Sequence, residues 1–109
     1  MYARGAKHTF ANEMMKDSVS AFMIKNFDLK HGMIMSFKIH LSENQLLHIG
    51  IFPDEEAADN AGRMVESARK QIIEMGAKIE LVNGPLSDFM VAGNVTLDQL
   101  IMMLSLIHI

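Results

Sequence analysis

The chain has 109 residues, half of them apolar, with a formal net charge of −3 and no cysteine. This composition excludes a disordered chain, and the missing cysteines exclude disulfides, thiolate metal ligands and thiol catalysis. The acidic balance argues against nucleic acid as a partner, and the longest apolar run, Leu100–Ile109, is far shorter than the ~20 residues of a membrane span. We therefore expect one domain over residues 1–109, located in the cytoplasm.

Methionine is unusually frequent, with eleven residues against one tyrosine and no tryptophan. Because its side chain is unbranched and polarisable, methionine fills irregular gaps in a core and adapts to flexible apolar partners. Two interpretations follow: a methionine-tolerant core, or an adaptable apolar cavity or interface.

The first predicted elements are a strand over Tyr2–Phe10 and a helix over Glu13–Phe27. Asn12 has the side chain of an N-cap, and apolar residues recur at helical spacing after it. One face of the strand carries Tyr2, Arg4, Ala6, His8 and Phe10.

Alternating apolar residues predict a hairpin of two strands, Met33–Leu41 and Leu46–Phe52. A two-residue turn at Glu43-Asn44 would pair Leu41 with Leu46 and place His40 and His48 on opposite faces. A five-residue loop, 42–46, would instead pair His40 directly with His48. We favour the second register because it aligns both apolar sets, and because Glu-Asn lacks the Asn-Gly chemistry of tight hairpins.

A second amphipathic helix is predicted over Glu55–Met75, with Asp54 as its N-cap. Glu55 and Glu56 suit the positive end of this helix, which explains them better than a catalytic acid pair does. Spacing of i,i+4 predicts the surface ion pairs Asp59–Arg63 and Glu66–Lys70.

The last predicted strand has two parts, Ile79–Val82 and Asp88–Ala92, separated by a bend at Asn83-Gly84-Pro85. Thr96–Gln99 has the form of a capping box and predicts an apolar helical extension over residues 96–109.

The order β-α-β-β-α-β predicts an α+β, ferredoxin-like sandwich with an antiparallel sheet and both main helices on one face. We expect the helices to cover the alternating apolar set that runs from Met33 to Leu41. The other face then lies uncovered, and it is too apolar to be simply solvated, so we expect a homodimer packed sheet against sheet. That face comprises Ile34, Ser36, Lys38, His40, His48, Gly50 and Phe52.

The segment Leu47–Ala58 resembles the strand-to-helix entry of the dimeric α+β barrel superfamily, within it the antibiotic-biosynthesis-monooxygenase-like group. The strand Gly32–Leu41 and the segment Val82–Pro85 support a resemblance over residues 1–93. It implies a dimer, and it implies cofactor-independent or haem-degrading chemistry at Trp, Asn and His residues. Phe52 stands where members often carry Trp and the chain has no Trp, so no catalytic residue is transferred.

The best candidate polar cluster joins Lys38 with His40 and His48, which could hold a carboxylate or ketone oxygen at the end of an apolar cavity. Alternatively, the two imidazoles are an exposed and inert pair at the sheet rim. Tyr2, Arg4 and Phe52 complete the candidate ligand site. No histidine spacing fixes three ligands, so we expect no metal and no other cofactor.

Three functions remain open. The first is a homodimeric protein that binds a fatty-acid-like or polyketide-like molecule with a polar head group in an apolar cavity between the two sheets. The second is a cofactor-independent monooxygenase or isomerase with His40 or His48 as its base. The third is a purely structural dimerisation module.

Overall fold

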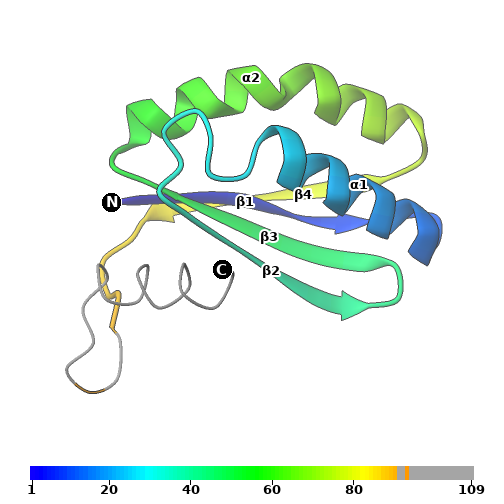
Figure 1. The fold of residues 1–109 in the computed structure, drawn as a ribbon, viewed down its shortest axis with the longest axis horizontal. Helices are drawn as coiled ribbons and strands as arrows, with labels where there is room; N and C mark the ends of the chain where they lie inside the picture. The colour runs from blue at the N-terminus through cyan, green and yellow to red at the C-terminus, as the bar shows by residue number, and fades with distance from the viewer. Residues whose placement is uncertain (91–92, 94–109) are drawn as a thin grey trace.

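A computed structural model describes residues 1–90 and residue 93 of the chain, and shows a four-stranded antiparallel sheet with both helices on one face (Figure 1). The strand order is β2-β3-β1-β4. This architecture confirms the predicted ferredoxin-like α+β fold. Its elements are β1 (Tyr2–Thr9), α1 (Glu13–Asn26), β2 (Met35–Ser42), β3 (Gln45–Phe52), α2 (Glu55–Glu74) and β4 (Lys78–Pro85).

The predicted caps start both helices. The Oδ1 of Asn12 accepts the backbone N–H of Met15 at 2.8 Å, and the Oδ1 of Asp54 accepts that of Ala57 at 2.8 Å. Each bond satisfies a helix N–H that has no partner within its own helix. Both helices end one residue before the predicted position, because Phe27 and Met75 are C-caps.

The β2–β3 hairpin has a different register from the predicted one. Lys38 lies opposite His48, and His40 lies opposite Leu46, so the predicted pairing of the two histidines is wrong. The chain turns tightly at 43–44. Just before this turn, between His40 and Ser42, the register of the pairing shifts by one residue. Because this bulge adds one unpaired residue, a tight turn coexists with aligned apolar sets, a combination outside both predicted registers.

The helices cover the opposite sheet face from the predicted one. Ala6, Leu46 and Phe52 lie beneath them with exposed fractions of 6%, 3% and 2%. The alternating apolar row of β2 and β3 lies on the uncovered face. Alternation identifies the two faces of a sheet but does not say which of two apolar faces meets a helix. The uncovered row comprises Met35, Phe37, Ile39, Leu47 and Ile49, and at its end Ile51, on the same face, is only 3% exposed.

The strand β4 is continuous from Lys78 to Pro85 and pairs along its whole length with β1. The predicted bend is therefore wrong, and Pro85 is tolerated because β4 lies at the edge of the sheet. Residues 88–90 are not a strand, so the predicted second part is wrong there. Residues 91–92 and the predicted helical extension at 96–109 lie outside the described residues.

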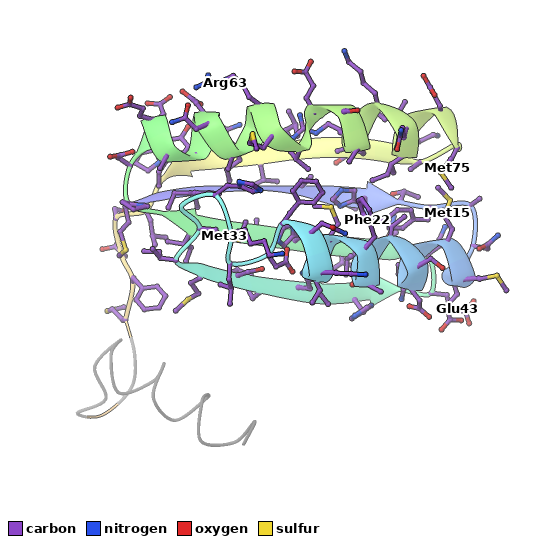
Figure 2. All side chains as sticks on the ribbon, turned by 45° about the horizontal axis from the view of Figure 1, so that its top comes forward. Met15, Phe22, Met33, Glu43, Arg63 and Met75 are labelled. Carbon is purple, nitrogen blue, oxygen red and sulfur yellow. The ribbon has the colours of Figure 1, made fainter. Side chains whose placement is uncertain are left out.

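Of the two predicted ion pairs on α2, one is confirmed. Glu66 pairs with Lys70 at 3.5 Å. Asp59 instead reaches across to β1 and pairs with Arg4 at 2.6 Å, and Arg63 hydrogen-bonds to a neighbouring asparagine of α2. Figure 2 shows Arg63 on the outer side of α2, away from the sheet. In the part of the chain that the structure describes, neither helix combines the length and apolar character needed to cross a bilayer.

Candidate functional site

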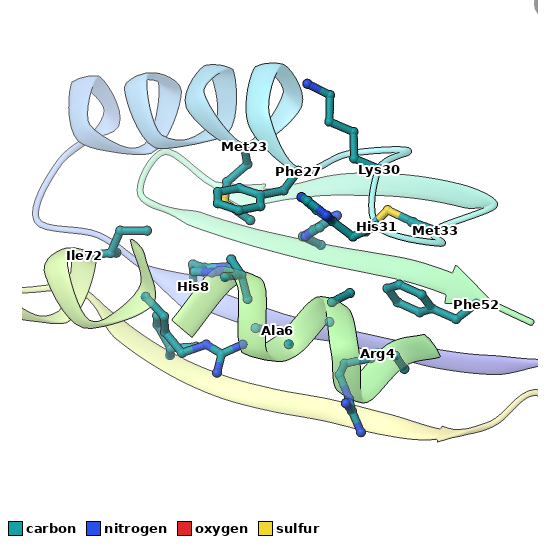
Figure 3. Close-up of a pocket in the computed structure, with 18 residues that line it drawn as sticks. Arg4, Ala6, His8, Met23, Phe27, Lys30, His31, Met33, Phe52 and Ile72 are labelled. Carbon is teal, nitrogen blue, oxygen red and sulfur yellow. The ribbon is translucent and has the colours of Figure 1, made fainter. Parts of the chain in front are cut away.

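A cavity of about 80 Å³ lies between the sheet and the helices of one protomer (Figure 3). Its walls come from β1, β3, α2 and β4, from Met23 of α1 and from the α1–β2 connection at 27–34. The side of the cavity formed by α2 is lined by Ala58, Ala61 and Gly62, and these short side chains leave the space open. Phe52, Met33 and Ile72 add apolar wall.

A buried polar cluster lies against this cavity. Asp28, on the α1–β2 connection, forms an ion pair with Lys38 through Oδ2, and its Oδ1 lies 3.4 Å from Nε2 of His48. The same Nε2 lies 3.1 Å from Oγ of Ser36. The exposed fractions of the side chains of Lys38, Asp28 and His48 are 12%, 10% and 9%. The cluster therefore ties the connection to the middle of the sheet in a weakly solvated environment, where its electrostatic interactions are strong.

Burial lowers the pKa of His48 to about 4, and the nearby ammonium of Lys38 contributes in the same direction against the attraction of Asp28. The imidazole of His48 is thus neutral at pH 7, and its contact with Asp28 is not an ion pair there. A proton on Nε2 allows it to donate toward Ser36 or Asp28. A pKa this low makes His48 a weak general base, since efficient bases have a pKa near the working pH.

His8 is a second buried imidazole on the cavity wall. It is 7% exposed, and it shares the helix-covered sheet face with His48, from the neighbouring strand. Burial lowers the pKa of His8 as well, and the positive charge of Arg69 acts in the same direction. Its Nδ1 is buried and has no hydrogen-bond partner among the described residues. Such an unpaired polar atom is uncommon in a folded protein and requires an explanation.

The α1–β2 connection has an uncommon backbone. Leu29 and His31 have φ values of 58° and 55°, and Gly32 follows with 87°. Non-glycine residues adopt positive φ rarely, and such conformations concentrate at ligand clamps and active sites. Here the same connection carries Phe27, His31 and Met33 into the cavity wall, between its anchor at Asp28 and the start of β2.

The structure brings together only part of the predicted site. Arg4, His48 and Phe52 line the cavity, whereas Lys38 lies behind its wall in the buried cluster. His40 is exposed on β2 and lines no part of this cavity, and the register pairs His48 with Lys38 and not with His40 as predicted.

Tyr2 lies outside the cavity wall. Its hydroxyl donates to Oδ1 of Asn83 at 3.1 Å, and the guanidinium of Arg4 lies 5.4 Å from the centre of its ring. Glu55 and Glu56 are exposed in the first turn of α2, as predicted. In residues 1–90 and 93, no group of three or more potential ligands could hold a metal ion.

Sequence reasoning left Asp28 and Arg69 out of the candidate site. Arg69 follows Val65 and precedes Ile72 at helical spacing, and this periodicity places it on the sheet side of α2. Asp28 lies in an irregular connection, where no periodicity indicates the direction of a side chain.

Comparisons with known proteins show the fold alone. No protein-family model matches the chain, and no curated protein matches it. The structure is similar to a dimeric ferredoxin-like protein from an uncultured marine organism, with a TM-score of 0.62 and 10% identity over 84% of this chain and 100% of that one. It is also similar to a protein of unknown function from Nitrosomonas europaea, with a TM-score of 0.51 and 13% identity over 84% of this chain and 96% of that one. The chain therefore has a ferredoxin-like fold, and its resemblance to the antibiotic-biosynthesis-monooxygenase-like group stays a prediction.

Proposed function

We propose that this chain is a homodimeric binding protein whose protomers each hold a small apolar molecule with a polar head group, between the sheet and the helices. The lining of the cavity carries this proposal. Its walls are mostly apolar, and every ionisable side chain among the described lining residues is basic. An apolar pocket with a few convergent polar groups is typical of small-molecule sites. The basic lining residues are Arg4, His8, Lys30, His31, His48 and Arg69.

The location of the cavity changes the predicted ligand. Because His48 and Phe52 lie beneath the helices, the site belongs to one protomer and not to the space between two sheets. A volume of about 80 Å³ holds several water molecules or one compact organic group, and it does not hold an extended long acyl chain. Each buried methylene contributes about 0.8 kcal/mol, so a compact apolar ligand binds weakly to moderately.

The uncovered sheet face supports the homodimer. Its four strands of eight residues, about 4.8 Å apart with a rise of about 3.3 Å per residue, present roughly 500 Å² in projection. The pleated side-chain surface is larger, so its area approaches the ~800 Å² per partner of a standard interface. Phe37 and Ile39 are 44% and 46% exposed there, part of an apolar row that a second copy would cover. A structurally similar protein is described as dimeric.

The binding function is favoured over an enzyme with a histidine base. His40 is outside the cavity, and the low pKa of His48 makes it a hydrogen-bonding group in preference to a proton acceptor. Both buried imidazoles are neutral and suit recognition of a polar head group.

Native mass spectrometry of the gently purified protein tests the proposal. We expect a dimer that carries up to two small adducts, or that takes them up from a mixture of monocyclic aromatic compounds. The substitution Val65→Phe, inside the cavity, should abolish uptake, whereas Met64→Phe, at an exposed neighbouring position of α2, should not. A dimer that never takes up a ligand, or equal uptake by both variants, would contradict the proposal.

A further inference from the structure

The basic groups of the cavity wall differ in how their charge is balanced. Arg4 forms an ion pair with Asp59 at 2.6 Å, so its charge is already compensated. Lys30 is exposed, donates to the backbone oxygen of Lys25 at 2.6 Å, and points away from the cavity in Figure 3. Arg69 is half-buried, and no acidic group of residues 1–90 lies within ion-pair distance of it. The cavity therefore has one half-buried positive charge that forms no ion pair with an acidic group of residues 1–90.

A hydrogen-bonding group accompanies this charge. His8, on β1, lines the same cavity as Arg69, on α2. It is 7% exposed, and its Nδ1 has no hydrogen-bond partner among the described residues. A guanidinium and a neutral imidazole that line one cavity match a head group that has negative charge and more than one acceptor oxygen, which a carboxylate has and an alcohol lacks.

We infer that the ligand is a small carboxylic acid, bound as its anion, with the carboxylate at Arg69 and His8 and a compact apolar body, such as a single aromatic ring, against Phe52 and Met33. This inference rests on the proposed function and names its ligand class. The small residues along α2 and the cavity volume of about 80 Å³ limit the size of the apolar part of the ligand. Arg69 supplies the charge, because Arg4 is neutralised within the protein.

Benzoate and benzyl alcohol are matched probes, since they share the ring and differ in charge. We expect benzoate to bind at least about tenfold more tightly to the full chain in a titration followed by NMR, as a charge-assisted hydrogen bond predicts. Arg69→Gln should remove most of this preference, and Arg69→Lys should restore part of it. Arg63→Gln is the matched control, because Arg63 lies on the same helix and lines no part of this cavity.

The possible results distinguish failure of the carboxylate assignment from failure of the proposed binding function. Equal affinity for both probes, or a benzoate preference that Arg69→Gln leaves intact, would overturn the carboxylate assignment while the binding function stands. If neither probe binds the folded dimer at millimolar concentration, the proposed function fails as well. Thermal melting of each variant establishes that it is folded, and Arg69→Lys keeps the test valid if Arg69→Gln unfolds.

Discussion

Substitution of Phe37 by alanine should dissociate the proposed dimer. Phe37 lies in the middle of the uncovered apolar row and is 44% exposed. A phenylalanine side chain has about 200 Å² of surface, so complete coverage by a partner would bury roughly 90 Å² more, equivalent to about 2 kcal/mol. A two-fold symmetric interface contains the residue twice, so Phe37→Ala should weaken dimerisation by about 4 kcal/mol, or roughly 1,000-fold in Kd.

Sedimentation equilibrium over nanomolar to micromolar concentrations measures this change directly. Phe22→Ala is a matched control, since Phe22 is 46% exposed on α1, on the other side of the sheet. We expect the control to dimerise like the unaltered chain and the Phe37 variant to be monomeric at low micromolar concentration. Because Phe37 is outside the buried core, both variants should remain folded. If the two variants dimerise equally, the sheet face is not the interface and the reasoning fails.

Three further predictions concern the buried residues. The pKa of His48 falls from 6.5 in the unfolded chain to about 4 on folding, so the unfolded chain binds more protons between these values. Urea unfolding should therefore show stability that is complete above pH 6.5 and falls by about 3 kcal/mol toward pH 4, a loss that His48→Asn reduces and that replacement of the exposed His40 does not. Asp28→Asn should destabilise the protein by about 3 kcal/mol at pH 7, because it leaves the ammonium of Lys38 buried without its partner; a loss below 1 kcal/mol would refute this role. Gly5→Ala should prevent folding, as judged by circular dichroism, because its Cβ would lie 1.8 Å from the backbone oxygen of His48; a native-like spectrum would show that the two strands can separate at little cost.

The elements and the fold could be predicted because local chemistry determines them. The capping side chains of Asn12 and Asp54 mark the helix starts, and alternation in the hairpin marks two strands. Their order then leaves few topologies for one small domain. The N-caps are correct to the residue, since a cap depends on side chains only a few positions apart.

The choice of sheet face could not be predicted in the same way. Both faces of the hairpin carry large apolar residues, and a partner protein covers an apolar face as well as a helix does. The sequence did contain one indication of the covered face, namely small residues in the two central strands. Ala6 and Gly50 lie on the face that the helices cover. The bulge after His40 was also invisible, because no residue type there requires it.

For the candidate site, the sequence indicated some of the lining residues and not their arrangement. His48, Phe52 and Arg4 do line one apolar cavity, yet beneath the helices and without His40. Arg69 reaches the cavity from a helix, and Asp28 reaches the adjacent polar cluster from a connection, so the arrangement forms only when these elements pack on the sheet. Sequence spacing within one hairpin cannot give that arrangement.

The methionines allow the most direct measurement of where a ligand binds. Met23 and Met33 line the cavity, whereas Met35 lies on the uncovered sheet face. With ¹³C-methyl-labelled methionine, an aromatic ligand shifts the methyl resonances that lie close to its ring, and Met→Leu variants assign them. On addition of benzoate, we predict large shifts for the methyl groups of Met23 and Met33 and none for Met35. Shifts confined to Met35 would place the ligand between the sheets, and no shift at any methyl group would contradict a binding cavity within the protomer.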